Sequence, residues 1–333
     1  MDINFTEEQE MLRASARDFL EKECTEDVIA EVEAGRLGYS PDLWHKITEL
    51  GWLGLVFPEQ YGGSEMNMVD LAVLYEEFGR AAFASPYTST IVLGGLTILE
   101  IGNDMQKSDI LPKLIEGEII IAAAISASDP GVEGTELRPD EVTIAATADG
   151  KDYLLNGVRL FVHNAGIADY LLVPARMKFR DDPDDSITLF LIHANSPGLN
   201  STRLTTIPGD NQYEVIFDNV RVSSDNIIGK PDEGWAPLTR SMQIAEVMMA
   251  SQMLGAGERL YKDSEEDFMT GMESGIPDDI KQHNEEYLAN LKQDIDVCRQ
   301  TTYQAAKKLA EGESFDFEGS ITRNWSRYAH QNA

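Results

Sequence analysis

The sequence is poor in cysteine and in basic residues. Its two cysteines, Cys24 and Cys298, lie far apart in 333 residues and form no CxxC pair. A disulfide-stapled scaffold is therefore excluded, and a reducing compartment is the simple interpretation. Lys and Arg number 27 against 58 Asp and Glu, which gives a formal net charge of −31. This balance argues against a surface for DNA or RNA, whose phosphates need clustered basic groups, and against an anionic membrane surface.

Long apolar runs are also missing. The longest runs from Ile119 to Ile125, far short of the ~20 residues that a membrane helix needs. The N-terminus, Met1 to Glu8, is acidic where a secretory signal would be basic and then apolar. We therefore expect a soluble, cytoplasmic protein with no membrane insertion.

Common catalytic motifs are absent too. The five histidines show no HxxxH or HxH spacing, so we expect no metal site. The sequence has no GxSxG elbow, no Walker loop and no GxGxxG. Hydrolases of that type and Rossmann nucleotide sites are therefore not supported. From the residues alone, the interpretation stops at a globular α+β protein that could bind a ligand at its sheet.

Helix signals fill the first third of the chain. Thr6 and Gln9 have the spacing of a capping box, in which each side chain satisfies a backbone N–H. Ser40-Pro41 predicts a second helix start, because proline at the first helical position loses no hydrogen bond. Asn67 predicts a third start, and Gly117 ends a fourth helix. We predict an all-helical N-terminal domain over residues 1–117.

The pattern changes to short strands at about residue 118. Asp149-Gly150 between two apolar segments predicts a type I′ hairpin, and Asn156-Gly157 repeats that signal. Further strands are predicted at 170–174, 187–193 and 214–217. Strands and turns at this spacing favour a central antiparallel β-barrel or sandwich over residues 118–231.

Helical periodicity returns in the last third of the chain. An apolar seam recurs every three or four residues and ends at Gly312. Its members are Leu288, Leu291, Ile295, Cys298, Thr302, Ala305 and Leu309. This seam belongs in a helix bundle or at a subunit interface. Another helix is predicted from Ser320, and it reaches Ala333 without a cap, so we expect residues 232–333 to form an incomplete C-terminal helical bundle. The fold class is α+β and multidomain.

Several segments together resemble the acyl-CoA dehydrogenases. They lie in the family's order along the whole chain: 49–63 (ELGWLGLVFPEQYGG), 75–80 (YEEFGR), 128–131 (SDPG), 153–166 (YLLNGVRLFVHNAG), 217–223 (FDNVRVS) and 228–235 (IGKPDEGW). The family oxidises the Cα–Cβ bond of an acyl-CoA thioester, with FAD as the hydride acceptor. The resemblance implies that Ser126, Ser128, Phe161 and His163 contact the flavin. Phe161 and His163 stand where the family has a stacking Trp and a flavin-contacting Thr, and the alternative is that both are ordinary sheet residues.

Other positions depart from the family pattern. The Ser that helps to hold CoA falls near Gly134, and the family's Arg-Gln-Phe-Gly motif is replaced by the acidic stretch 266–275. The family's catalytic Glu, which precedes a Gly-Thr pair, has no counterpart before Ala333. Some relatives carry the base on the helix that opens the last domain, and that position is Ala245 here. Its neighbour Glu246 is a weak candidate, because one residue on a helix is ~100° of rotation, and we expect a structural carboxylate.

Residues 76–93 resemble the branch of the family that degrades steroids and other bulky substrates. In that branch two homologous subunits often assemble, and one of them lacks parts of the active site. The resemblance therefore implies an acyl-CoA dehydrogenase of lipid or steroid catabolism that lacks its own base. Its partners would be a homologous subunit or a second copy, and a flavoprotein that accepts electrons. The alternative is a flavin-free structural or binding homologue of the same fold.

Overall fold

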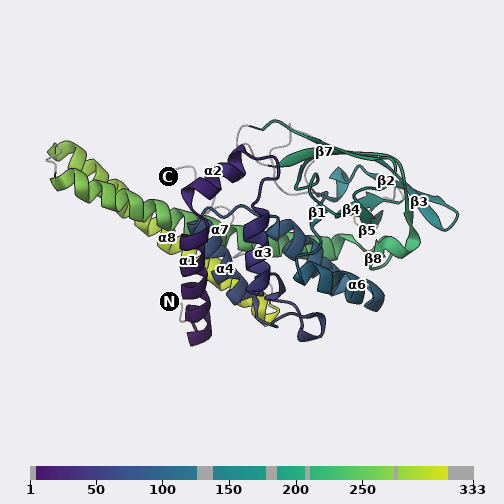
Figure 1. Ribbon diagram of the computed structural model, residues 1–333, viewed down its shortest axis with the longest axis horizontal. Coiled ribbons are helices and arrows are strands. Elements are labelled where there is room, and N and C mark those ends of the chain that lie inside the picture. The colour runs from purple at the N-terminus through teal and green to yellow at the C-terminus, as the bar shows by residue number, and fades with distance from the viewer. Residues whose placement is uncertain (1–4, 126–137, 178–185, 207–210, 274–276, 314–333) are drawn as a thin grey trace. The chain divides into compact units, whose positions relative to one another are not determined.

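The computed structural model describes residues 5–125, 138–177, 186–206, 211–273 and 277–313. The chain divides into two compact units, each built from separate segments (Figure 1). Unit 1 comprises Met1–Ile29, Met66–Phe83 and Gln243–Ala333, and unit 2 comprises Ala30–Glu65 and Ala84–Met242. The three predicted domain ranges stay a prediction.

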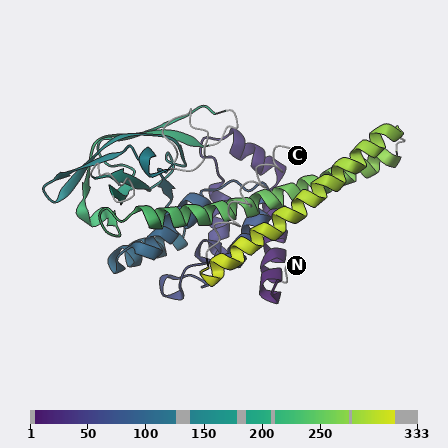
Figure 2. The same ribbon diagram turned by 180° about the vertical axis from the view of Figure 1, so that it is seen from behind.

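Unit 1 is helical. Its elements are α1 (Glu7–Glu23), the start of α2 (Glu26–Ala34), α4 (Met68–Arg80), most of α7 (Trp235–Glu273) and α8 (Asp278–Glu311). Helix α4 packs against both α1 and α8. Helices α7 and α8 lie side by side as a long antiparallel pair, as Figure 2 shows from behind. The helical character predicted for both ends of the chain is confirmed.

The helix termini in unit 1 follow local sequence signals. Thr6 and Gln9 form the predicted capping box of α1. Asn67 caps α4, and the Asp70 carboxylate accepts a hydrogen bond from the Asn67 N–H. Gly312 ends α8 with φ 71°, a left-handed conformation that glycine adopts without steric cost. These signals act within four residues, which is why the sequence reveals them.

The apolar seam of α8 is a core element of unit 1. Its central members are buried: Leu291, Ile295, Cys298, Thr302 and Ala305. The predicted place in a helix bundle is therefore confirmed for the part of α8 that carries this seam. The further helix predicted from Ser320 lies outside the described residues.

Unit 2 combines short helices with a sheet. The helices include α3 (Pro41–Glu49), α5 (Leu96–Ile101), α6 (Asp104–Ile115), the 3-10 turns η1 (Trp52–Gly54), η2 (Glu59–Tyr61), η4 (Pro139–Glu141) and η6 (Ser224–Asn226), and η3 (Thr88–Gly95), which is a π-helix. The strands are β1 (Ile121–Ala123), β2 (Ala145–Asp149), β3 (Asp152–His163), β4 (Tyr170–Arg176), β5 (Ile187–His193), β6 (Leu199–Arg203), β7 (Gln212–Ser223) and β8 (Ile227–Ile228). Ser40 caps α3 and Pro41 takes its first position, as predicted.

The strands form one sheet in the order β6-β7-β3-β2-β4-β5-β8, with β1 pairing with β4. Most neighbours are antiparallel, as predicted, but β1 and β2 both pair with β4 in parallel. Among the described strands this path does not close, so the expected barrel or sandwich is an open mixed sheet. Its core includes Leu155, Val162, Phe190 and Phe217.

The two predicted hairpin turns have different outcomes. Strands β2 and β3 are joined by a tight turn after Asp149, with Gly150 at φ 67°. The turn predicted at Asn156-Gly157 is wrong, because both residues lie inside β3. There the register slips by one residue opposite Asn219, and the Asn156 side chain accepts the Asn219 N–H at 2.9 Å. Gly157, with φ 144°, serves a β-bulge rather than a turn.

The described helices have no stretch with the length and hydropathy that crossing a membrane requires. This agrees with the short apolar runs of the sequence.

Candidate functional site

A β-bulge near the end of β3 has a backbone conformation that bulky residues rarely adopt. Arg159 pairs with Val215 and Val162 with Tyr213, so three steps on β3 match two on β7. Phe161, within this bulge, has φ 57°. A bulky residue in the left-handed region is strained, and such strain persists only where the surroundings enforce it. Bulges commonly re-aim side chains beside functional sites.

The bulge presents the two side chains for which the resemblance predicts flavin contact. Val162 is buried in the sheet core, whereas Phe161 is half-buried and His163 is exposed. Val162 and His163 follow the ordinary alternation of a strand, so His163 lies on the face opposite the buried Val162. Phe161 has a left-handed backbone within the bulge, where this alternation does not apply. The His163 Nε2 lies 3.4 Å from the Gln212 Nε2 across the β3–β7 pair. The end of β3 therefore carries a partly accessible aromatic ring and an exposed imidazole two residues apart.

The turn after β3 is held by three polar residues. Asn164, with φ 63°, donates its main-chain N–H to the Asn211 carbonyl at 2.9 Å. The Asn164 side-chain amide donates to Ser89 Oγ at 3.3 Å. Asn211 is buried, accepts the Tyr213 hydroxyl at 3.0 Å and donates to the Leu37 carbonyl at 2.5 Å. The turn that follows the bulge is thus held by Ser89 of η3 and by Asn211, which Tyr213 of β7 and the Leu37 carbonyl hold in turn.

Two buried arginines fix the segment at η4. Arg159 is fully buried and donates to the Glu141 carbonyl at 3.0 Å. Burial lowers the pKa of Arg159 to about 10. Arg176 donates to the carbonyls of Pro139 and Val142 and to Ser186 Oγ. Ser126 and Ser128, the other two predicted flavin contacts, lie outside the described residues.

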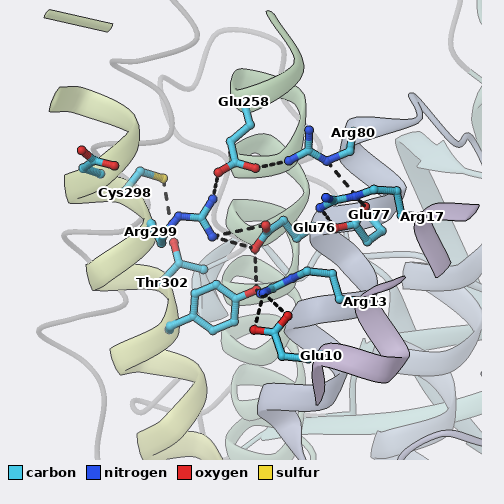
Figure 3. Close-up of polar contacts among 12 residues, drawn as sticks. Glu10, Arg13, Arg17, Glu76, Glu77, Arg80, Glu258, Cys298, Arg299 and Thr302 are labelled. Atoms are coloured by element: carbon cyan, nitrogen blue, oxygen red, sulfur yellow. Dashed lines mark hydrogen bonds and ion pairs between the residues drawn. The ribbon is translucent and has the colours of Figure 1, made fainter. Parts of the chain in front are cut away.

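Unit 1 contains a second polar cluster, shown in Figure 3. Glu76 and Glu77 on α4 are each 1% exposed. The Arg17 guanidinium donates two hydrogen bonds to the Glu77 carboxylate, at 3.0 and 2.6 Å. The Arg299 guanidinium lies 3.3 Å from the Glu76 carboxylate. Glu258 on α7 pairs with both Arg80 and Arg299. The buried carboxylates are paired, so this cluster serves as a structural ion-pair network that joins α1, α4, α7 and α8.

Two family models match consecutive parts of the chain. The family model described as "Acyl-CoA dehydrogenase, N-terminal domain" matches residues 6–118, and "Acyl-CoA dehydrogenase, middle domain" matches 124–220. This chain belongs to the acyl-CoA dehydrogenase family. The middle-domain match spans β3 and its bulge.

Individual members of the family match this chain over almost its whole length. "Acyl-CoA dehydrogenase" of Bacillus subtilis (strain 168) is 29% identical over 332 residues, covering 97% of this chain and 85% of that protein. The structure of butyryl-CoA dehydrogenase from Megasphaera elsdenii has a TM-score of 0.87 at 26% identity, covering 99% of this chain and 86% of that one. The ChsE4-ChsE5 complex from Mycobacterium tuberculosis has a TM-score of 0.87 at 22% identity, covering 100% and 85%, and shows the shared fold.

The region where some acyl-CoA dehydrogenases carry their base is an ordinary stretch of α7. Ala245 is buried, and its neighbour Glu246 is half-buried. Because this stretch is regular α-helix, the two side chains differ by ~100° in direction. Farther along α7, the acidic stretch that replaces the family's Arg-Gln-Phe-Gly motif begins at Glu266, which is exposed, as are its neighbours Glu265 and Asp267.

Sequence reasoning missed the residues that hold the bulge. Ser89, Asn164 and Asn211 meet only in the folded unit, although up to 122 positions separate them in the chain. The one local signal is Asn164 itself, since asparagine tolerates the left-handed conformation better than most residues. Its position next to His163 marks the end of the strand.

Proposed function

We propose that this chain is an acyl-CoA dehydrogenase-like flavoprotein that takes part in α,β-dehydrogenation of an acyl-CoA thioester. The observation that carries the proposal is the strained bulge at Phe161, which lies inside the segment 153–166 that resembles the family's flavin-contacting strand. Family membership and the butyryl-CoA dehydrogenase structure support the same chemistry. It would make the protein an oxidoreductase that acts on CH–CH donors.

The described residues fit a flavin. FAD, when bound, accepts the hydride that leaves Cβ of the acyl chain. Phe161 offers a partly accessible aromatic face for stacking, and His163 offers a ring nitrogen at an exposed position. Ser126 and Ser128 complete the proposed set of flavin contacts. The buried Val162 between Phe161 and His163 anchors both to the sheet core.

We further propose that the chain lacks its own base and works as one subunit of a hetero-oligomer. Ala245 cannot take a proton, and Glu246 is turned away from that position by one helical step. The exposed carboxylates Glu265, Glu266 and Asp267 disfavour an anionic pyrophosphate, which an Arg would pair with. A homologous subunit that bears a Glu would supply the base, and a flavoprotein would take the electrons.

The test is flavin binding. The chain is purified alone and together with its homologous partner, and FAD affinity is measured by titration of flavin absorbance. We expect a yellow preparation. Preparations that stay colourless, alone and with the partner, after incubation with FAD would instead favour a flavin-free homologue.

A matched pair of variants tests the proposed register. Phe161→Ala keeps a Cβ, and therefore the steric cost of the left-handed backbone, while it removes the ring. Because a stacked aromatic contributes ~0.5–1.5 kcal/mol beyond its buried area, FAD should bind several-fold more weakly. Leu160→Ala, in the same bulge, is the control and should leave the affinity close to that of the wild type. Unchanged affinity and spectrum in Phe161→Ala would show that the ring does not contact the flavin.

A further inference from the structure

Two adjacent residues of the π-helix η3 hold two separate parts of unit 2, the turn after β3 and the strand β1. The Ser89 hydroxyl accepts the Asn164 side-chain amide at 3.3 Å and donates to the Pro86 carbonyl at 3.0 Å. Ser89 is 7% exposed. It therefore connects the turn that follows the Phe161–His163 bulge to the start of η3.

Thr90 forms a reciprocal pair with the first residue of β1. Its hydroxyl accepts the Ile121 N–H at 3.2 Å and donates to the Ile121 carbonyl at 3.3 Å. Thr90 is fully buried. A side chain that satisfies both main-chain groups of one strand residue fixes that residue in position and in register.

The packing of η3 leaves little freedom for movement between these contacts. A Cβ at Gly94 would meet Ile121 at 2.8 Å, and a Cβ at Gly95 would meet Phe57 at 2.6 Å. The π-helix therefore packs directly on β1 and on Phe57, which lies between η1 and η2. π-Helical turns are rare and occur frequently at functional sites, and this one is eight residues long.

We propose that Ser89 and Thr90 are positioning residues for the flavin. They fix the bulge that carries Phe161 and His163 against β1, so that the two side chains meet the flavin ring in one arrangement. This inference rests on the proposed function, because it assigns these hydroxyls a role in a flavin site. Neither hydroxyl needs to touch the cofactor.

The strain at the bulge explains why the hydrogen bonds of Ser89 and Thr90 are needed. Phe161 and Asn164 both have positive φ, at 57° and 63°. A backbone of this kind relaxes unless its surroundings determine it. The hydrogen bond from Asn164 to Ser89 links this strained segment to η3, 75 residues away in the sequence. Its loss should let the bulge sample other conformations.

The experiment uses Ser89→Ala, Thr90→Val and Asn164→Gly. In Asn164→Gly the residue can still adopt positive φ without steric cost, but the side-chain amide is gone. This variant therefore tests the hydrogen bond to Ser89 without changing the preferred backbone conformation. We expect FAD to bind about threefold to tenfold more weakly in Ser89→Ala and in Asn164→Gly, as for the loss of one hydrogen bond. The flavin absorption spectrum and reduction potential should shift as well, which a general loss of stability would not cause.

Two controls match these variants. Thr97 on α5 is also fully buried, but its hydroxyl donates to the Leu93 carbonyl of η3, four residues earlier, and among the described residues it has no bond to the sheet. Thr97→Val should therefore leave the spectrum unchanged. Asn219 has φ 51° in the other bulge of the same strand pair, so Asn219→Gly should leave FAD affinity unchanged. Hydrogen exchange of the segment 159–167 in FAD-free protein should speed up in Ser89→Ala and stay unchanged in both controls.

The outcomes separate the two proposals. One result would overturn the positioning role alone. In it, the wild type binds FAD, and the three variants match it in affinity, spectrum and potential: Ser89→Ala, Thr90→Val and Asn164→Gly. Unchanged hydrogen exchange in Ser89→Ala would overturn it too, whether or not FAD binds. Failure of the wild-type chain to bind FAD, alone and with its partner, would overturn the proposed function and this inference with it.

Discussion

The hydroxyl of Tyr303 on α8 donates its hydrogen bond to a carboxylate oxygen of Glu76 on α4. The two side chains are 3% and 1% exposed, and 227 positions separate them in the chain. Arg13 from α1 also donates to the Tyr303 oxygen at 3.4 Å. One buried tyrosine therefore connects α1, α4 and α8 in unit 1.

Tyr303→Phe should destabilise unit 1 because Glu76 loses a buried hydrogen-bond donor. Leaving a buried polar group short of a partner costs about 1–3 kcal/mol, more when the group is charged. Arg299 still pairs with Glu76 at 3.3 Å, so we expect a loss in the lower half of that range. Urea denaturation followed by far-ultraviolet circular dichroism would measure the change in the free energy of unfolding.

The matched control is Tyr261→Phe. The Tyr261 hydroxyl donates to Glu265 at 2.9 Å, which is the same chemistry at an exposed position. Exposed pairs of this kind contribute little, so the change should be within about 0.5 kcal/mol. Equal losses for the two variants would contradict the role assigned to burial at Tyr303.

The same tyrosine predicts alkaline sensitivity. Burial, and then the charge of Glu76, raise the pKa of Tyr303 well above its ordinary value of 10.0. Above pH 10 the unfolded chain releases this proton while the folded chain retains it. The contribution to stability is therefore complete below pH 10 and is lost as the pH rises toward the folded pKa. Denaturation at a series of pH values should show a fall in the wild type above pH 10 that is smaller in Tyr303→Phe.

Helices α4 and α7 cross in direct backbone contact, which makes two glycines indispensable. A Cβ at Gly255 would lie 1.8 Å from the Glu76 carbonyl oxygen, and one at Gly79 would lie 1.7 Å from that of Gln252. Because the added Cβ would meet main-chain atoms of the neighbouring helix, a whole helix would have to shift. Gly255→Ala should cost about 3 kcal/mol, the upper end of typical overpacking, as measured by urea denaturation.

Gly257→Ala, two residues farther along α7, is the control. Its added Cβ would find Ile295 Cγ1 at 3.8 Å, an ordinary contact. Alanine is also the better helix former by up to about 1 kcal/mol. This variant should therefore match or exceed the wild type in stability. A destabilised Gly257→Ala with an unaffected Gly255→Ala would place the helix crossing elsewhere.

The sequence predicts those parts of the fold that local chemistry decides. Thr6, Ser40 and Asn67 cap helices as expected, because a cap needs only a side chain and the next few N–H groups. Gly150 likewise marks its hairpin. At Asn156-Gly157 the same reasoning fails, since residues that favour positive φ suit bulges as well as turns. Pairing with the strand β7 determines whether a bulge or a turn forms at this position.

The candidate site depends still more on long-range pairing. Phe161 and His163 are predicted only through the family resemblance, and neither residue type alone indicates a flavin. The bulge at Phe161 depends on the register of β3 against β7, and the π-helix at Thr88–Gly95 has no local sequence signature. Ser89 therefore becomes a site residue only once the fold brings it to Asn164.

Glu246 is the carboxylate next to the position at which some relatives carry their base. The purified chain, loaded with FAD, should show negligible dehydrogenase activity with any acyl-CoA, because proton abstraction by a positioned base is worth ~10²–10⁴-fold. Glu246→Gln should leave that background unchanged, since the relatives' base position is the buried Ala245. Reduction of an artificial dye acceptor across acyl-CoA chain lengths would measure the activity, and flavin absorbance would verify that each sample carries cofactor. Addition of the homologous subunit should restore turnover in both forms. Robust turnover by the single chain, abolished in Glu246→Gln, would identify Glu246 as the base and remove the reason to invoke a partner.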